Sequence, residues 1–570
     1  MNYRKITLIA ILLVLVIAPR LASLNSFVTI DEPFWLSVGA NFYYALGQRE
    51  FQNTVYEYHP AVTTMWFVTG AMLAYFPEYR GLGQGYFDVD KNKFDPFLLE
   101  HGISPLELLF YSRLFQLALI LLLVMTIFQL LSLLVGDQTA FLATGLMSSA
   151  PFFLGHSLLL NHEALLAVCI LAAIFGMMAY LEVNRKLIYL LISAAAASLA
   201  HLTKSSAIAM MPVIALMLAV SLFHHRREGG FGRALLDHLK IFAIWLTALA
   251  IVYITLWPGM WVAPAKMLYE VYGNAFSYAF QGARLQVTQE LQPAQFSLDS
   301  AGPAITGFLS DLLWRSTPVV WLGIPLAAVA FFLHGDAAPS STLKRLMFYL
   351  LLTAALFLLM FSVAQGRNSA HYIMTSHTSL DAIAGLGWGV WLGWFSTKWK
   401  RMSKPGIRIG LAVSLIALQL WSALSFYPYY YTFYNPLMAK LTGRTTAYGY
   451  GEGLELAAAY LAAMPDAETL TAFVYHGRGP FSYFFPGQTL TINPLFVDEP
   501  GMGPMVERLV LSDYLVFYED FGTRSEHTAR FVAALQDIQP EHVISVQGLE
   551  NILIYRVADF PPEFYETINE

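Results

Sequence analysis

Charged residues are scarce in this chain, and their scarcity excludes a water-soluble globule. Asp, Glu, Lys and Arg make up 13% of the 570 residues, whereas soluble domains carry about 25%. Hydrophobic residues make up 57%, and the mean hydropathy is +0.53. The single cysteine, Cys169, excludes an intramolecular disulfide. The composition therefore indicates a polytopic membrane protein.

Several motifs for cofactors are also missing from the sequence. No Gly-x-x-x-x-Gly-Lys loop occurs, and no predicted strand is followed by Gly-x-Gly-x-x-Gly, so we expect no nucleotide cofactor. The His-Glu-x-x-His spacing of zinc sites is absent as well. A net charge of −6 over this length gives no sign of a nucleic-acid partner.

Long apolar runs predict about eleven transmembrane helices, because a crossing needs about 20 residues. The runs lie near residues 6–22, 108–135, 138–156, 164–183, 187–202, 205–223, 240–257, 313–333, 346–363, 373–395 and 408–427. No Ala-x-Ala cleavage site follows the first run. We therefore expect that run to remain as an uncleaved anchor.

Lys and Arg gather in alternate loops, and this bias predicts the orientation of the chain. The basic loops carry Arg4-Lys5, Arg185-Lys186, residues 224–233, Lys344-Arg345 and residues 398–408. These loops should face the cytoplasm, which places the N-terminus inside and the tail outside. Compact loops and the lack of retention signals favour a prokaryotic plasma (inner) membrane.

The sequence predicts two domains. A transmembrane domain covers residues 1–430 and includes a first outer loop, 23–107, with interfacial helices over 33–47 and 60–76. Residues 431–570 have a soluble composition and predict a small extracytoplasmic α/β domain. Its expected elements are helices over 451–464 and 528–535, strands over 470–475 and 514–518, and a hairpin over 542–557.

Ionisable residues gather on the predicted outer side of the membrane. Charged groups at membrane depth are costly, and they usually face a cavity or a partner. We therefore expect one outward-facing polar site. Its candidate members are Asp31, Glu32, His59, Arg113, His162, Glu163, Lys204, Arg367 and His371.

Seven short motifs occur in a characteristic order along the chain. They are Asp31-Glu32-Pro33, His59 to Trp66, Asn161 to Leu165, Leu202 to Ser205, Trp257 to Trp261, Tyr434-Asn435-Pro436 and Tyr450 to Gly453. Together they resemble the glycosyltransferase C superfamily, and within it the protein O-mannosyltransferases and aminoarabinose transferases. This resemblance implies a membrane enzyme that moves a sugar from a polyisoprenyl phosphate to an acceptor hydroxyl on the outer face. The sugar, the prenyl lipid and the acceptor, whether lipid, glycan or protein, stay open.

Asp31 is the expected general base, by analogy with the first acidic residue of the superfamily. Glu32 would hold a neighbouring residue, a metal or the acceptor. One carboxylate base and a phosphate leaving group suit an inverting, single displacement. The other interpretation is a helix start, because Asp caps helices and Pro favours the first turn. One carboxylate can also cap while the other reacts.

Candidate ligands of the donor phosphate lie at the outer ends of other spans. Lys204 stands in a Thr-Lys-Ser turn that resembles a superfamily element, and a compact ammonium suits a phosphate oxygen. A lysine near a span end also snorkels to the interface, which is the alternative interpretation. The remaining candidates are His59, Arg113, Arg367, His371 and Tyr372.

His162 and Glu163 are candidate ligands of a divalent metal ion, or of the acceptor. The alternative interpretation of this pair is a polar turn that joins two spans. For the chain as a whole, a transporter of lipid-linked sugars or another polar substrate is the alternative function. Transporters often contain related halves with helices broken at matching positions, and the sequence shows no such symmetry.

Overall fold

The computed structural model describes residues 3–56, 59–89, 93–273, 275, 301–333, 338–364, 369–445, 448–492, 503–518 and 526–569. Contacts divide the chain into two compact units. The first unit contains Met1–Ala22, Gly39–Gly83 and Ser112–Thr445, and the second contains Ser23–Val38, Gln84–Tyr111 and Thr446–Glu570. Two segments of the predicted outer loop therefore pack with the C-terminal region in the second unit. The domain boundary near residue 430 stays a prediction.

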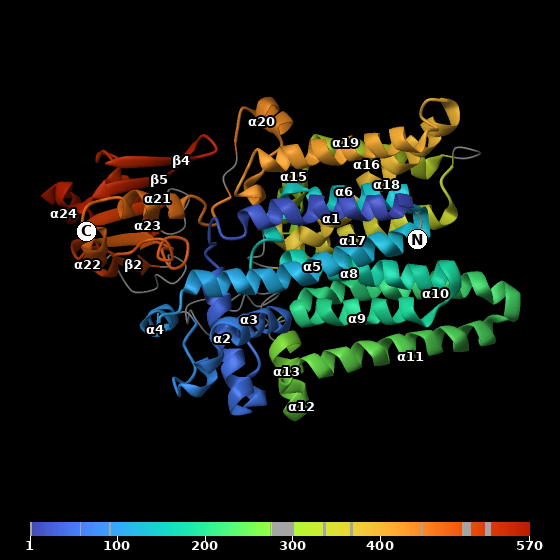
Figure 1. Ribbon diagram of the computed structural model, residues 1–570, viewed down its shortest axis with the longest axis horizontal. Coiled ribbons are helices and arrows are strands. Elements are labelled where there is room, and N and C mark those ends of the chain that lie inside the picture. Colours follow the sequence, from blue (N-terminus) through green and yellow to red (C-terminus); the bar gives the residue numbers. More distant parts are fainter. Residues whose placement is uncertain are drawn as a thin grey trace. The chain divides into compact units, whose positions relative to one another are not determined.

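The described part of the first unit is helical, with long helices that run side by side (Figure 1). Its longer helices are α1 (Tyr3–Ser23), α3 (Val62–Tyr75), α5 (Pro105–Val135, which begins in the second unit), α6 (Asp137–Ser149), α8 (Glu163–Ala179), α9 (Leu187–Thr203), α10 (Met211–Gly229), α11 (Phe231–Leu256), α15 (Ala301–Arg315), α16 (Pro318–Phe332), α17 (Ser341–Val363), α18 (Met374–Lys398) and α19 (Pro405–Leu424). Shorter ones are α7 (Pro151–His156), α12 (Gly259–Val262), α13 (Pro264–Leu268) and α20 (Pro436–Thr442). Helix α2 (Glu32–Gln48) contributes to both units.

Among the described residues, seven helices are long and apolar enough to cross a membrane, or eight if α15 and α16, bent by 113°, form one span. Each predicted apolar run coincides with helical structure, and the chain is a multi-pass membrane protein. The lower count has a physical reason. Helices α6 and α9 have only 13 and 17 residues, which is shorter than a crossing requires. Helix α18 has 25 residues, but its sequence is more polar than that of the seven candidate spans.

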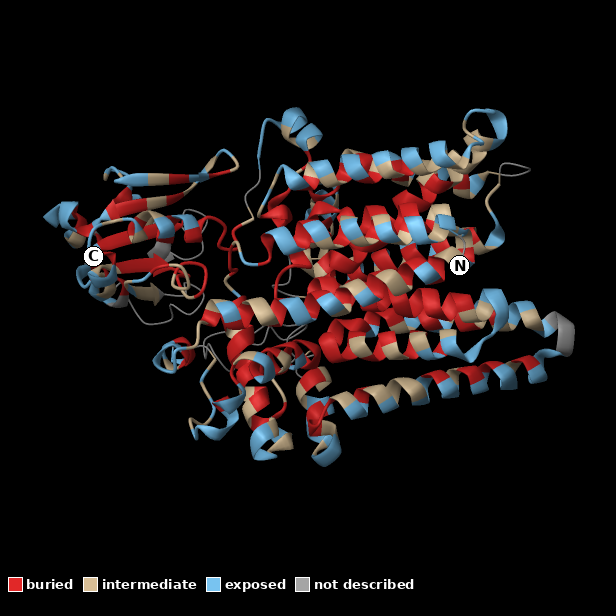
Figure 2. Cartoon of the chain, viewed as in Figure 1, coloured by how far each residue is buried: buried red, intermediate tan, exposed pale blue. Residues whose placement is uncertain are grey.

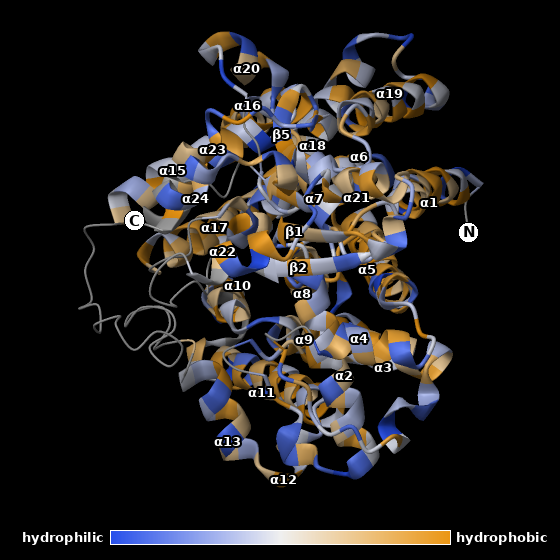
Figure 3. Cartoon of the chain, turned by 90° about the vertical axis from the view of Figure 1, so that its left-hand side faces the viewer, coloured by the Kyte–Doolittle hydropathy of each residue, from blue (hydrophilic) through white to orange (hydrophobic). Residues whose placement is uncertain are grey.

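Burial separates the central helix of the first unit from a peripheral one. In the helical stretch Glu163–Asn184, which contains α8, 89% of the residues in the most apolar part are buried, whereas in α11 the share is 17% (Figure 2). A helix that is hydrophobic on all sides belongs in an interior. Helix α11 instead leaves Leu236, Leu239 and Ile251 exposed, and Figure 3 marks apolar residues along this helix in orange. Such a surface is suited to contact with lipid.

Small residues allow the helices of the first unit to approach closely. A Cβ atom on Gly385 of α18 would lie 2.4 Å from the Cα of Ala143 in α6. Between α8 and α9, Ser193 Oγ donates a hydrogen bond to the Ala173 carbonyl at 2.7 Å. Close backbone approach and hydroxyl hydrogen bonds are the usual means by which membrane helices associate.

The basic segments of the first unit meet at one end of it. Arg345 pairs with Glu182, and Arg185 Nη2 lies 3.2 Å from His225 Nε2. Figure 1 shows the N-terminus, the α10–α11 turn and the α18–α19 turn at this same end of the unit. The arrangement agrees with the alternation of basic loops, and the compartment that this end faces stays a prediction.

The second unit contains a five-stranded sheet in the order β2-β1-β3-β5-β4. Strand β1 pairs in parallel with β2 and β3, and β5 pairs antiparallel with β3 and β4. The strands are β1 (Thr471–Tyr475), β2 (Gln488–Ile492), β3 (Tyr514–Tyr518), β4 (His542–Val546) and β5 (Leu549–Arg556). The helices are α4 (Phe94–Glu100), α21 (Leu454–Ala462), α22 (Gly503–Val510), α23 (Glu526–Leu535) and α24 (Pro562–Asn569).

The predicted α/β character of the tail is confirmed, and its core explains why. All five residues of β3 are buried, as in a strand covered on both faces. Tyr475 of β1 packs against Phe517 of β3, with ring centroids 5.6 Å apart, and against Phe531 of α23 at 6.3 Å. Both predicted helices, both predicted strands and the hairpin are present. Strand β2 and helices α22 and α24 were not predicted.

Candidate functional site

The two carboxylates at the start of α2 have different environments. Helix α2 begins at Glu32, and the Asp31 carbonyl accepts the Trp35 amide at 3.2 Å. Glu32 is fully buried, and its Oε2 accepts the Thr29 amide at 2.8 Å and the Thr29 hydroxyl at 2.9 Å. The Asp31 side chain is exposed. Glu32 therefore stabilises the turn that precedes the helix, and the Asp31 carboxylate is the one open to a reactant.

Tyr450 holds the Asp31 carboxylate from a distant part of the chain. Its phenol donates a hydrogen bond to Asp31 Oδ2 at 2.5 Å, and its carbonyl accepts the Ile30 amide at 3.4 Å. Glu452 fixes the turn by accepting the amides of Gly449 at 2.9 Å and of Tyr450 at 2.8 Å. The sequence motif around Tyr450 was noted, but the contact was missed because 419 positions separate the two residues.

A second network ties the first turn of α2 to the rest of the second unit. Arg478 donates to Asp95 Oδ2 at 2.8 Å, to Ser37 Oγ at 2.7 Å and to the Val89 carbonyl at 2.9 Å. A charged group with several partners resists displacement more than one with a single partner. Arg478 and Asp95 thus position the helix that carries Asp31, although no sequence pattern indicated either residue.

Gly479 allows the tail to approach the start of α2, and its replacement by Ala tests that packing. Gly479 has φ +87°, and an added Cβ would lie 2.2 Å from Pro33 Cγ. We expect Gly479→Ala to lower the free energy of unfolding by about 1–3 kcal/mol for overpacking beyond the strain of a positive φ. The matched control is Gly548→Ala, with φ +81° and open space around the added Cβ. Thermal unfolding of both variants separates the two effects, and equal losses would contradict the packing role.

Buried phenols in the second unit predict loss of stability in alkali. Burial raises the pKa of Tyr450 well above 10.0, with a further contribution from the negative charge of Asp31. Burial likewise raises the pKa of Tyr483, next to Asp95. The folded state thus favours the neutral phenols, so their stabilising effect is complete below about pH 10 and is lost as the pH rises through the folded-state pKa. Thermal unfolding should therefore show a falling midpoint above about pH 10, and a smaller fall for Tyr450→Phe. Equal falls in both proteins would contradict this assignment.

A buried cation lies in the first unit, at the end of α9. Lys204 is 3% exposed and donates to Glu163 Oε1 at the start of α8. Its Nζ also lies 4.7 Å from the ring centroid of Tyr372 and 5.6 Å from that of Phe361. An ammonium over aromatic faces gains from the ring quadrupoles, more so when it is desolvated. The lysine is therefore held inside the helical body and does not snorkel to its surface.

Histidine rings lie beside both residues of the ion pair between Lys204 and Glu163. The rings of His59 and His162 lie 5.7 Å apart, and those of His371 and Tyr372 lie 4.4 Å apart. His371 in turn lies 5.9 Å from the ring of His156. Six expected residues thus form one series of contacts, which we call the Lys204 cluster: His59, His162, Glu163, Lys204, His371 and Tyr372.

The structure places one of the two arginines that were expected to bind the donor phosphate, Arg113, but does not describe the other, Arg367. Arg113 is buried in α5, one turn before Gln116, whose amide donates to the Leu159 carbonyl at 2.5 Å. Residues three apart share a helix face, so Arg113 lies on the face of α5 that meets the segment before α8. Arg367 falls outside the described residues. Asp31 and Glu32 belong to the second unit, whereas the Lys204 cluster and Arg113 belong to the first.

The expected metal ligands do not form a complete metal site. Across the residues that the structure describes, no group of three or more His, Cys, Asp or Glu side chains could hold an ion. Glu163 accepts the ammonium of Lys204, and His162 packs against the His59 ring. Structural zinc sites have four protein ligands and catalytic ones three, so His162 and Glu163 alone do not complete such a site, and their binding of a metal ion stays a prediction.

The family comparison concerns the middle of the membrane region. Residues 108–257 match the family model described as dolichyl-phosphate-mannose-protein mannosyltransferase. The matched segment runs from α5 to the end of α11 and includes Arg113, His162, Glu163 and Lys204. This match confirms the resemblance expected from the sequence motifs. None of the curated proteins matches the chain.

Solved structures of several membrane proteins are similar to this chain. ArnT from Cupriavidus metallidurans, bound to undecaprenyl phosphate, is 13% identical, with 97% of each chain covered and a TM-score of 0.48. The oligosaccharyltransferase of Archaeoglobus fulgidus in the apo form is 13% identical over 94% of this chain and 71% of that chain, with a TM-score of 0.42. The S. cerevisiae protein O-mannosyltransferase Pmt1-Pmt2 complex bound to the sugar donor is 18% identical over 47% of this chain and 34% of that chain, with a TM-score of 0.37.

Proposed function

We propose that this membrane protein, an enzyme of the glycosyltransferase C type, transfers a sugar from a polyisoprenyl phosphate to an acceptor hydroxyl. The family match over residues 108–257 supports the class of reaction and donor. The observation that carries the mechanism is the exposed Asp31 carboxylate at the start of α2, oriented by the Tyr450 phenol. A carboxylate in that position is suited to take the proton of an incoming hydroxyl.

The reaction is a single displacement at the anomeric carbon. The acceptor oxygen forms a bond to that carbon while the bond from the carbon to the phosphate oxygen breaks. Asp31 takes the proton of the acceptor hydroxyl, and the bonding electrons leave with the polyisoprenyl phosphate. A general base of this kind contributes about 10²–10⁴-fold to the rate.

The different environments of Asp31 and Glu32 support inversion of configuration. Retaining transfer through a glycosyl-enzyme uses two carboxylates about 5–5.5 Å apart, one as nucleophile and one as acid and base. Glu32 is buried and accepts two hydrogen bonds from Thr29, so it is committed to the turn. One available carboxylate is what an inverting displacement requires.

Lys204 is the proposed group for the charge of the departing phosphate. Its ammonium is buried and pairs with the Glu163 carboxylate. It also lies over the face of the Tyr372 ring. A fixed cation in a water-poor site stabilises developing negative charge more strongly than one in solvent. His59, Arg113, Arg367, His371 and Tyr372 are the further proposed ligands of the phosphate.

The proposed reaction takes place on the extracytoplasmic face. This side is opposite the basic loops, which the charge bias assigns to the cytoplasm. The N-terminus would then be cytoplasmic, and the α/β region over 431–570 would lie outside a prokaryotic plasma membrane. A cysteine introduced at exposed Asp466 or at exposed Lys400, with Cys169 replaced by Ser, tests this orientation by labelling with an impermeant thiol reagent in intact cells. Labelling at position 466 alone is the expected result.

The experiment that tests the function is sugar transfer in proteoliposomes. A panel of radiolabelled polyisoprenyl-phosphate sugars is offered with lysate acceptors, with and without a chelator. Transfer from one donor is the expected result. Loss of transfer in the presence of the chelator would support a divalent metal ion at His162 and Glu163. Movement of an unaltered lipid-linked sugar across the bilayer, without transfer, would instead support the transporter.

Tyr450→Phe tests whether the phenol orients the base. The variant keeps the ring and removes the hydrogen bond to Asp31, and hydrogen bonds to charged groups contribute about 1.5–3 kcal/mol. We expect kcat to fall by roughly 10- to 100-fold, with KM for the donor nearly unchanged. The control is Tyr460→Phe, which removes another bond from a phenol to a carboxylate, to Glu541 at 3.1 Å. Equal kinetic losses in the two variants would contradict the positioning role.

A further inference from the structure

A pocket of about 340 Å³ opens in the first unit, at the end where the basic segments meet. It lies among the ends of α1, α6, α18 and α19, and Gly136, Thr139, Gly389 and Ile409 are among its lining residues. Its volume falls near the lower limit for small-molecule sites, which span about 300–1,000 Å³. The pocket contains none of the residues assigned to sugar transfer.

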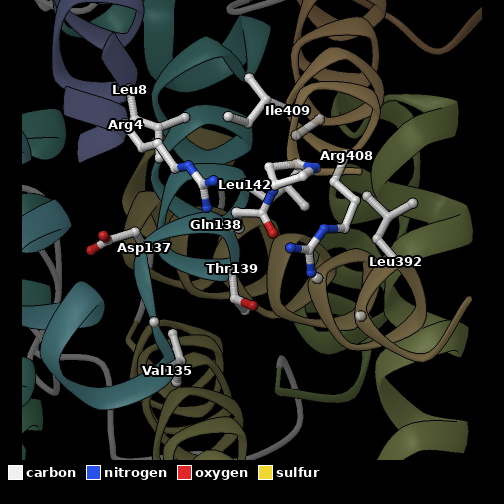
Figure 4. Close-up of a pocket in the computed structure, with 15 residues that line it drawn as sticks. Arg4, Leu8, Val135, Asp137, Gln138, Thr139, Leu142, Leu392, Arg408 and Ile409 are labelled. Atoms are coloured by element: carbon white, nitrogen blue, oxygen red, sulfur yellow. The ribbon is translucent and has the colours of Figure 1, made fainter. Parts of the chain in front are cut away.

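Two arginines give the pocket a positive character. Arg4 extends into it from α1 and Arg408 from α19, and Gln138 lies between them (Figure 4). Arg408 Nε is buried and has no hydrogen-bond partner among the described residues. Guanidinium groups present paired N–H donors that match the oxygens of a phosphate. The pocket therefore combines two guanidinium groups with the side-chain amide of Gln138 and the hydroxyl of Thr139.

Among the described residues that line the pocket, Asp137 is the one carboxylate, and it is already paired. Asp137 lies 3.6 Å from Lys5, and its side chain is directed away from the two arginines (Figure 4). With Arg4, Lys5 and Arg408 against Asp137, the local balance is positive. An anion between the arginines thus meets more attraction than repulsion.

A helix terminus adds backbone donors to the same pocket. Helix α6 begins at Asp137, and its N-cap, Gly136, provides no side chain to cap the first amides. Unsatisfied amides and the helix dipole favour an anion at such an end. Helix α19 also begins here, but its first residue is Pro405, which lacks an N–H. The two arginines and the α6 terminus are therefore the main recognition elements.

Aromatic residues indicate the depth of the pocket in the membrane. The segment of α18 that lines it, Gly389 to Gly393, is followed by the packed rings of Trp394, Phe395 and Trp399, with Phe395 and Trp399 stacked 5.1 Å apart. Exposed Lys400 and Arg401 come next. Aromatic belts and basic residues mark the headgroup level of a bilayer. A ligand in this pocket is thus most accessible from the lipid headgroups.

We propose that this pocket binds the phosphate group of an anionic phospholipid, held between Arg4 and Arg408 at the N-terminus of α6. The site lies at the end of the first unit opposite the Lys204 cluster. The continuous helical stretch Glu163–Asn184, α8 and the turn that follows it, runs from Glu163 in that cluster to Glu182, whose partner Arg345 lies among the basic segments. The proposal does not depend on the transfer reaction. The two arginines would bind a lipid from the membrane leaflet on the side where the basic segments meet.

The test measures binding to the full chain in neutral detergent. Phosphatidylglycerol, inorganic phosphate and phosphatidylcholine are titrated separately, and the rise of the unfolding midpoint gives each dissociation constant. The variants are Arg4→Gln, Arg408→Gln and the control Arg401→Gln, which removes the same charge from an exposed residue that does not line the pocket. Arg4 is exposed, so its variant tests the proposal even where Arg408→Gln fails to fold.

The expected result is that phosphatidylglycerol binds the native chain and the control equally, and about tenfold more weakly to either pocket variant. Phosphatidylcholine should bind more weakly than phosphatidylglycerol to the native chain. Binding of inorganic phosphate with the same dependence on the two arginines would show that the anionic group alone is recognised, whereas binding of the lipid only would show that the acyl part contributes. Native binding by Arg4→Gln, or an equal loss in Arg401→Gln, would overturn the proposal.

Discussion

Asp31→Asn is expected to lower kcat for sugar transfer by about 10²–10⁴-fold, the range for loss of a general base. The amide keeps the shape of the side chain and can still accept the Tyr450 hydrogen bond, but it cannot take the proton of the acceptor. Binding of the lipid-linked donor does not require that proton transfer. We therefore expect KM for the donor to stay nearly unchanged, which places the loss in the transition state.

The control for this variant is Asp466→Asn in the same unit. Asp466 is exposed, lies in a turn and has φ +62°, a conformation that Asn also tolerates well. Its replacement should leave both transfer and unfolding at native values. A native rate for Asp31→Asn would remove Asp31 as the base, and a loss of folded protein would make the second variant, Asp31→Glu, the informative one.

Lys204→Met is expected to destabilise the first unit by about 3–5 kcal/mol, because removing one partner leaves a buried charge without compensation. Met fills a volume similar to that of the lysine stem, so the cost arises from Glu163 and not from a cavity. The Glu163 carboxylate is 7% exposed and loses its cation. Thermal unfolding in detergent measures the effect.

The double variant Lys204→Met, Glu163→Gln separates stability from function. Replacing a buried ion pair by groups without charge is often neutral, so this variant should regain most of the lost stability. It should not regain transfer, because no ammonium remains to face the departing phosphate. Recovery of both properties would show that Lys204 has a structural role alone, whereas recovery of neither would show that the pair is needed for folding.

Local signals in the sequence were sufficient for most of the fold. Each predicted apolar run coincides with helical structure, because a bilayer requires long apolar segments. The number of spans was harder to predict, since α9 has only 17 residues, fewer than the about 20 that a crossing needs, and α18 carries polar residues such as Asp381 in a buried environment. Strand β2 was missed because polar and apolar residues alternate only over the four positions 489–492, which is a weak pattern.

The candidate site was predictable where it depends on short motifs and not where it depends on distant contacts. Asp31, Glu163 and Lys204 each stand in a recognisable local string. The hydrogen bond from Tyr450 to Asp31 spans 419 positions, and the pair of Arg478 with Asp95 spans 383. Neither pair has a local pattern, because the fold alone brings the partners together. Polar groups from distant segments can therefore be assigned only once the structure is known.

The three-segment composition of the second unit has a consequence for biogenesis. Residues 23–38 leave the ribosome early, but their partners in residues 446–570 are synthesised much later. Domains fold during synthesis only when their segments are all available, and long sequence separation slows the closing contacts. The turn around Asp31 must therefore wait for the tail, including Tyr450 and Arg478. Under the proposed mechanism, a nascent chain that has not yet reached Tyr450 and Arg478 has no oriented base, so synthesis of this region must precede activity.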